Sequence, residues 1–175
     1  KLGIVPSMVR SWIQTGCMDG VDWGGVKRIL STGEASNPEE NRFLQHLTGY
    51  NAQVDEYCGG TELAGGHSGN VGYLPSSLSK FNTKALGVDF RLITGQTDSG
   101  VAIEAETGES GELFMVPPSI GLSERLVNKD HFAEYYADTP VLSDCRQLRK
   151  HGDRMVYAHG FYGSKGRTEI GRAHV

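Results

Sequence analysis

The stretch Glu56-Tyr57-Cys58-Gly59-Gly60-Thr61-Glu62 decides how the rest of the sequence is interpreted. It includes the end of a run, residues 52–57, that is typical of a β-strand. The glycine pair would let the backbone approach a ligand closely, because glycine has no Cβ. Thr61 then offers a hydroxyl that can bond a phosphate oxygen, and Glu62 offers a carboxylate that can hold Mg²⁺. Taken alone, a strand followed by two glycines is more often a structural turn.

The sequence before this stretch alternates between strand and helix patterns. Residues 2–5 and 26–31 are short runs typical of strands. Between them, Ser7 is a candidate helix cap and Gly16 a candidate helix end. Residues 37–49 begin with Asn-Pro-Glu-Glu, which predicts a well-capped helix with acidic residues in its first turn. Alternating strands and helices predict an α/β layer.

The character of the sequence changes after about residue 65. Short β-like runs broken by glycine predict an antiparallel barrel or sandwich segment. One helical pattern interrupts them at residues 129–136. We therefore expect an α/β fold with an incomplete α/β part at residues 1–65 and a mostly β, barrel-like part at residues 66–168. The β-like runs are residues 88–93, 101–105, 112–116 and 154–158.

Composition narrows the class of protein. The chain has 175 residues with 24 glycines, about twice the usual share, which indicates many turns and close backbone approaches. Its net charge of −4, without a long run of one sign, argues against a dedicated nucleic-acid or membrane-surface binder. Three widely spaced cysteines do not suggest a disulfide framework, and a reducing compartment is the better expectation. No apolar stretch approaches the roughly 20 residues that span a bilayer.

Two further segments offer polar groups next to predicted strands. Ser-Thr-Gly-Glu-Ala-Ser-Asn, residues 31–37, joins a strand to a helix, where ligands often sit in α/β layers. His151-Gly152-Asp153 places a carboxylate after a glycine turn, where it can bond sugar hydroxyls, and Gly166-Arg167 adds a cation. Each segment alone is more often a connector or a surface turn. We expect the basic residues before the second segment to form a solvated face: Arg146, Arg149 and Lys150.

In their order and spacing, these segments resemble the adenylate-forming superfamily of acyl-CoA synthetases, non-ribosomal adenylation domains and luciferases. The resemblance covers nearly all of residues 1–168. STGEASN, EYCGGTE and RKHGD look like a plant-type acyl-activating branch of the acetate- or butyrate-CoA ligase kind. The matching motifs are Val5-Pro6-Ser7, the adenine loop Gly33-Glu34-Ala35, Gly59-Gly60-Thr61-Glu62 for Tyr-Gly-x-Thr-Glu, Gly111-Glu112-Leu113, His151-Gly152-Asp153 for Thr-Gly-Asp, and Gly166-Arg167 before the interdomain hinge.

The resemblance implies a ligase that uses ATP, Mg²⁺ and coenzyme A. A carboxylate attacks the α-phosphate of ATP to give an acyl-adenylate, and the thiol of coenzyme A then displaces AMP. By resemblance, Thr61 contacts the α-phosphate, Glu62 ligates Mg²⁺, and Asp153 bonds the ribose with help from Arg167. The residues expected to line the adenine or the rest of the nucleotide are Gly33, Glu34, Ala35, Glu56, Tyr57, Cys58, Gly59 and Gly60.

The sequence also departs from the family pattern. Cys58 stands where most members have an aromatic residue that stacks on adenine. Tyr57, one place earlier, should point to the opposite face of the strand. His151 replaces the usual threonine, and a structural histidine is the default interpretation. His67 could border the acyl pocket, although a loop histidine without a catalytic role is the simpler expectation.

Several parts of the family pattern are missing from the chain. No glycine-, serine- and threonine-rich phosphate loop with a lysine occurs, nor does the aromatic-rich acyl-site motif. The C-terminal domain with its catalytic lysine would begin at the hinge. We therefore expect an internal fragment that is inactive alone and whose partners include the missing N-terminal half and C-terminal domain. The resemblance favours a cytoplasmic or peroxisomal enzyme, not a secreted one.

Three other hypotheses remain open at this point. An adenylation module could pass the acyl group to a carrier protein or another acceptor, which the C-terminal domain would reveal. A non-catalytic nucleotide-binding relative would lack both the phosphate loop and the lysine in its full-length sequence. An unrelated glycine-rich β protein would not bring Thr61, Glu62, Asp153 and Arg167 together.

The last seven residues, 169–175 (EIGRAHV), match the translation of a common sequencing adapter, GAG ATC GGA AGA GCA CAC GTC. We hypothesise that they are adapter read-through and exclude them from fold reasoning. Synonymous codons that differ from the adapter in the nucleotide sequence would disprove this.

Overall fold

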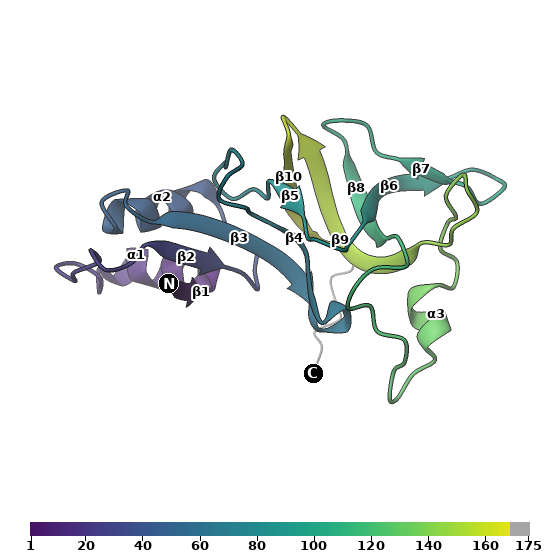
Figure 1. The fold of residues 1–175 in the computed structure, drawn as a ribbon, viewed down its shortest axis with the longest axis horizontal. Helices are drawn as coiled ribbons and strands as arrows, with labels where there is room; N and C mark the ends of the chain where they lie inside the picture. The colour runs from purple at the N-terminus through teal and green to yellow at the C-terminus, as the bar shows by residue number, and fades with distance from the viewer. Residues whose placement is uncertain (169–175) are drawn as a thin grey trace.

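The computed structural model describes residues 1–168, which form two five-stranded sheets with short helices (Figure 1). The first sheet comprises β1 (Leu2–Ile4), β2 (Arg28–Ser31), β3 (Gln53–Gly60), β4 (Gly65–Gly69) and β5 (Thr83–Lys84). The second comprises β6 (Phe90–Gln96), β7 (Ala102–Glu104), β8 (Ser110–Met115), β9 (Arg149–Ala158) and β10 (Phe161–Arg167). The helices are α1 (Pro6–Thr15), α2 (Pro38–Leu47), the single-turn η1 (Thr61–Leu63) and α3 (His131–Tyr135). The hypothesis about adapter read-through concerns residues outside the described range.

The two longer helices begin in different ways. Asn37 caps α2 as predicted: its side chain accepts hydrogen bonds from the amides of Glu39 and Glu40, and Glu40 accepts one from the Asn37 amide. This reciprocal capping satisfies amides that a helix start leaves without partners. The prediction of Ser7 as the cap of α1 is wrong. Val5 holds that position without a side-chain bond, because Pro6 starts the helix and needs no amide partner.

The helices α1 and α2 cover one face of the parallel strands β1, β2 and β3. Their shared core contains Ile29, which is fully buried, and Val9 and Leu44, which are 1% exposed. Leu30, the next residue on β2, faces the opposite side and is 41% exposed. The α/β layer expected from the alternating pattern is therefore present, with apolar side chains on both of its faces.

Strand β3 joins the parallel and antiparallel parts of the first sheet. Residues 53–56 pair with β2 in parallel, and residues 57–60 pair with β4 in antiparallel register, with an irregularity between Cys58 and Gly59. The sheet thus continues past residue 65 through β4 and β5. At Gly59 a Cβ would collide with the backbone of Gly65 on β4, so this close approach requires glycine. Figure 1 shows β3 running from the helical end of the molecule to the second sheet.

The second sheet is antiparallel, with strand order β10-β9-β8-β6-β7. Within the described residues its strands do not close into a barrel, and an isolated bridge joins Tyr162 of β10 to Phe81. The expected mixed α/β class is confirmed. The central strand β8 of this sheet is apolar on both faces. Leu113 and Met115 pack toward Phe90 and Leu63, and Phe114 packs toward the segment that carries Leu142 and Leu148. The second sheet therefore has a core on each side.

The expected solvated face before β9 is wrong for Arg149. This side chain is fully buried: its guanidinium lies 3.8 Å above the centre of the Tyr135 ring and donates to the Ser123 hydroxyl at 2.8 Å. Stacking on an aromatic ring suits the planar guanidinium and offsets part of its loss of water. Arg149 thus holds α3 and the preceding loop against the sheet. In the described part of the chain, no helix is both long and apolar enough to span a membrane.

Candidate functional site

A pocket of about 240 Å³ lies where the two sheets meet. It draws on the loop after β2, on β3, and on β9 and β10 of the second sheet. Nine of the twelve residues expected at the site line it: Gly33, Glu34, Ala35, Glu56, Tyr57, Cys58, Gly59, Asp153 and Arg167. Segments separated by about 120 positions in the sequence therefore share one concave surface.

The loop at residues 33–37 is held in place by charged and polar contacts. Glu34 accepts from the Ser7 hydroxyl at 2.7 Å and from Arg10 at 2.6 Å, which ties the loop to α1. Arg10 also bonds Glu40 at 2.9 Å and so links α1, the loop and α2. The hydrogen bond from Ser7 and the bond from Arg10 lower the pKa of Glu34. Glu34 therefore remains charged and fixes the outer wall of the pocket.

Glu56 fixes the inner side of the same loop. This carboxylate is 4% exposed and accepts from the Ser36 hydroxyl at 2.8 Å and from the Asn41 amide at 3.0 Å. Burial raises the pKa of Glu56, and the hydrogen bonds from Ser36 and Asn41 partly oppose that rise. Glu56 was expected to contact the nucleotide. It lines the pocket, and its bonds to Ser36 and Asn41 also hold the loop and α2 against β3.

Asp153 is the most connected side chain of the pocket. It follows Gly152, whose φ of +90° favours glycine, and a Cβ at position 152 would lie 3.1 Å from Arg167 Nη2. Arg167 reaches Asp153 Oδ1 at 3.5 Å and donates to the His151 carbonyl at 3.0 Å. Burial alone would raise the pKa of Asp153, but the interactions with the His151 and His67 rings outweigh burial and lower it. The carboxylate is therefore ionised and faces the pocket.

His151 lies between the two carboxylates that the sequence singled out. Its Nδ1 is 2.9 Å from Glu62 Oε1 and its Nε2 is 3.2 Å from Asp153 Oδ2, although neither ring nitrogen is aligned for a hydrogen bond. Burial lowers the pKa of His151, but the two carboxylates outweigh burial and raise it. We attribute that rise to the proximity of charges, because the ion-pair distances are short while the hydrogen-bond angles are poor. The expected structural histidine thus bridges Glu62 and Asp153.

Cys58 and Tyr57 have different surroundings, in line with their neighbouring positions on a strand. Cys58 packs against the core of the second sheet, and its Sγ lies 3.7 Å from Asp153 Oδ2. Burial and the Asp153 charge raise the pKa of the Cys58 thiol to about 12, so the thiol is not nucleophilic at neutral pH. Tyr57 is 42% exposed, and its ring lies over Gly66, where a Cβ would clash with it.

Thr61 and Glu62 line a neighbouring cavity of about 550 Å³. That cavity is bordered by the segment around Ser123 and by α3. Glu62 still connects to the first pocket through His151, and the interaction with His151 lowers the pKa of Glu62 to about 2. Gly60 lines neither space; a Cβ at that position would collide with the Glu62 carboxylate. His151 therefore links Glu62 to Asp153, and Arg167 contacts Asp153 in turn. Thr61 lines the second cavity beside Glu62.

Some pocket residues had no signal in the sequence. Ser79 and Phe81 lie in a stretch without a motif, and Phe81 reaches the site because it bridges to Tyr162 of β10. Ser164 enters from β10 across the irregularity in its pairing with β9. These positions depend on long-range strand pairing. Only Ser36 and Gly166 of the missed residues belong to segments that had drawn attention.

Comparisons with known proteins bear on the fold and on the relatives of the chain. No protein-family model matches the chain. It is 34% identical to hexanoyl-CoA synthase of Cannabis sativa and 34% identical to probable acyl-activating enzyme 17, peroxisomal, of Arabidopsis thaliana. Each match covers 96% of this chain and 23% of the relative. Among solved structures, acetoacetyl-CoA synthetase from Streptomyces lividans superimposes with a TM-score of 0.76 at 21% identity, over 95% of this chain and 26% of that one.

The fold is thus that of part of the acyl-CoA synthetases and ligases of known structure. The sequence similarity to acyl-activating enzymes adds to this likeness of fold. Over 96% of its length the chain is similar to part of these acyl-activating and acyl-CoA-forming relatives, and it spans 23% of the length of the curated relatives that it matches.

Proposed function

We propose that this chain is the nucleotide-holding part of an ATP-dependent, AMP-forming acyl-CoA ligase. Such an enzyme activates a carboxylate as an acyl-adenylate and transfers the acyl group to coenzyme A. The observation that carries the proposal is the convergence of the loop at residues 33–35, Cys58 and Asp153 on one pocket. Similarity to relatives named for acyl-CoA synthesis and acyl activation supports the reaction class.

In this proposal the pocket binds the nucleoside of ATP. The Asp153 carboxylate accepts hydrogen bonds from the two ribose hydroxyls, because it is ionised and its oxygens act only as acceptors. Arg167 holds Asp153 in position and offers further donors. The loop at residues 33–35 and the Tyr57–Cys58 segment form the walls of the adenine site. Cys58 fills its place by packing, without chemistry of its own.

Thr61 and Glu62 belong to the phosphate end of the proposed site. The Thr61 hydroxyl bonds the α-phosphate, and Glu62 is the proposed ligand of Mg²⁺. A carboxylate whose pKa is about 2 is ionised at neutral pH, which fits the oxygen ligands that Mg²⁺ prefers. When bound, Mg²⁺ neutralises phosphate charge, and acceleration of such reactions comes from positioning and electrostatic stabilisation. His151 keeps Glu62 and Asp153 at a fixed separation before substrate arrives.

We propose a cytoplasmic or peroxisomal location, since two curated relatives are named as peroxisomal. Pyrophosphate exchange into ATP by the full-length enzyme, measured with a panel of carboxylates that includes hexanoate, tests the function. We expect acid-dependent exchange, formation of the acyl-CoA thioester, and a higher KM for ATP in Asp153→Ala. Absence of exchange with every acid would refute adenylation. Exchange without thioester formation would favour transfer to a carrier protein.

A further inference from the structure

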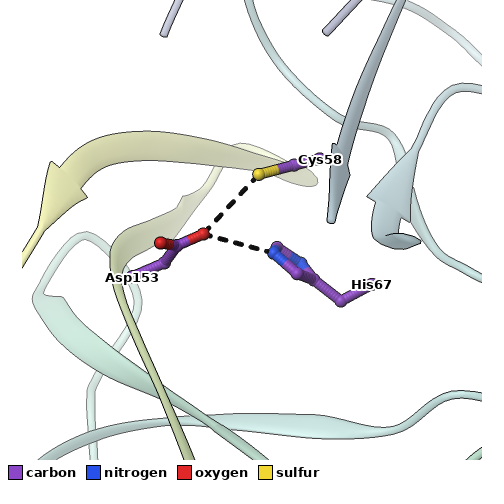
Figure 2. A group of neighbouring side chains, drawn as sticks. All are labelled: Cys58, His67 and Asp153. Carbon is purple, nitrogen blue, oxygen red and sulfur yellow. Dashed lines mark hydrogen bonds and ion pairs between the residues drawn. The ribbon is translucent and has the colours of Figure 1, made fainter. Parts of the chain in front are cut away.

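Three potential metal ligands from different strands converge behind the nucleotide pocket. They are Cys58 of β3, His67 of β4 and Asp153 of β9. Cys58 Sγ lies 3.7 Å from Asp153 Oδ2, and His67 Nε2 lies 3.4 Å from the same oxygen. One ligand atom of each residue is within 4.8 Å of the other two. Figure 2 shows the thiol and the imidazole reaching one oxygen of the carboxylate.

The types and separations of these atoms suit a zinc-like cation. Zinc takes thiolate, imidazole and carboxylate ligands at about 2.0–2.3 Å, and neighbouring ligands around a tetrahedral ion are then about 3.3–3.8 Å apart. The separations of Cys58 Sγ and His67 Nε2 from Asp153 Oδ2, 3.7 Å and 3.4 Å, fall in this range, and the third pair of ligand atoms is within 4.8 Å. His67 is fully buried and its Nδ1 is engaged with the Ser68 hydroxyl at 2.8 Å, which orients Nε2 toward Asp153.

His151 provides a second, independent observation. It is 5% exposed, and its ring nitrogens lie 2.9 Å from Glu62 Oε1 and 3.2 Å from the same Asp153 oxygen, in both cases without the geometry of a hydrogen bond. Its ring is 4.9 Å from the His67 ring. Buried polar atoms without a hydrogen bond are uncommon in folded proteins. A water molecule bound to a cation at the three-residue cluster would give this ring a hydrogen-bond partner.

We propose that Cys58, His67 and Asp153 bind a zinc-like divalent cation, with water in the remaining coordination position. On binding, the metal–sulfur bond forms as the Cys58 thiol releases its proton to solvent, while the carboxylate and the neutral imidazole bind through lone pairs. Because Asp153 then serves the metal, the cation competes with a nucleotide for this residue. This last consequence rests on the proposed function; metal binding itself does not.

Cobalt(II) titration tests the site directly in this chain. The background protein carries Cys17→Ser and Cys145→Ser, because both of these cysteines are free and exposed and would bind metal themselves. We expect thiolate-to-cobalt charge-transfer absorption that saturates at one equivalent and is displaced by zinc. Adding Cys58→Ser should abolish the absorption, and Cys58→Ser or His67→Gln should weaken zinc binding by at least about tenfold. The exposed His46→Gln serves as the matched control and should change neither.

Absence of the absorption band, or an unchanged band in Cys58→Ser, would leave only a hydrogen-bonded cluster and overturn the proposal. If circular dichroism shows that Cys58→Ser does not fold, the alkylation rate of Cys58 in the background protein tests metal binding instead. Zinc must slow this alkylation, and an unaffected rate overturns the site.

In the full-length enzyme, zinc should weaken ATP binding more in the wild type than in His67→Gln. If ATP binds neither protein with or without zinc, the proposed function fails while the cobalt result stands.

Discussion

Replacing His151 with glutamine tests whether this residue stabilises the two carboxylates that it separates. His151 is 5% exposed, with ring nitrogens 2.9 Å from Glu62 and 3.2 Å from Asp153. Glutamine keeps a similar size and hydrogen-bonding capacity but cannot become positively charged. Two half-buried carboxylates would then face each other without the cation between them, although Arg167 still contacts Asp153, and the folded state should lose stability.

The pKa of Glu62 gives the size of the effect. The interaction with His151 lowers that pKa from 4.5 to about 2, and each pKa unit corresponds to about 1.36 kcal/mol. The upper bound is therefore about 3 kcal/mol. Glu62 is partly exposed to solvent, which screens the interaction, so we expect His151→Gln to lower the free energy of unfolding by about 1–2 kcal/mol.

The loss in free energy of unfolding caused by His151→Gln should depend on pH. The folded-state pKa of His151 is raised above 6.5, so its contribution is complete below pH 6.5 and disappears as pH rises through the folded-state value. The folded-state pKa of Glu62 is lowered to about 2, so its contribution is present above pH 4.5 and disappears as pH falls toward 2. The cost of His151→Gln should therefore be greatest between about pH 4.5 and 6.5.

Urea unfolding followed by circular dichroism, repeated from pH 4 to 9 for wild type and variant, measures this cost. The exposed His46→Gln is the control and should show a small difference at every pH. If His151→Gln lowers the free energy of unfolding equally at pH 6 and pH 9, the ion-pair reasoning is refuted. Lost packing would then explain the lower stability.

Three further predictions concern the loop and the thiol. Asn37→Ala should lower the free energy of unfolding by about 1 kcal/mol in thermal unfolding, because two amides of α2 lose their acceptor; no change would mean that solvent replaces the cap. Glu56→Ala should cost about 1–3 kcal/mol because Ser36 loses its buried acceptor, and Glu56→Gln, which retains one acceptor oxygen, should cost less; equal costs would contradict this. At pH 8, iodoacetamide should modify the exposed Cys17 well before Cys58, whose thiol pKa is about 12; mass spectrometry showing equal rates would contradict that assignment.

The parts of the fold that sequence predicted well are those set by neighbouring residues. The capping of α2 needs only Asn37 and the next three residues, so the sequence alone is enough to recognise it. Gly16 ends α1 in a left-handed conformation, as its position suggested. The start of α1 was missed because Pro6 made a capping side chain unnecessary.

The parts that sequence could not predict depend on contacts between distant segments. Arg149 was assigned to solvent because its neighbours are basic, yet Tyr135 and Ser123 bury it. His67 and Asp153 are 86 positions apart, and no local pattern shows that β4 and β9 bring them together. The choice between a barrel and a sandwich also stayed open for this reason, since closure depends on whether edge strands pair and not on the strands' own composition.

The change of pairing partner along β3 has a consequence for amide hydrogen exchange. Residues 53–56 exchange through opening of the parallel part, whereas residues 57–60 exchange through opening of the antiparallel part. Cooperative units with different opening free energies can therefore meet between Glu56 and Tyr57, two residues of the pocket. A ligand bound there would contact both units and should slow exchange in both halves of the strand together. Slower exchange in both halves of β3 at once would then indicate that a ligand occupies the pocket, because the ligand couples two opening reactions that are otherwise separate.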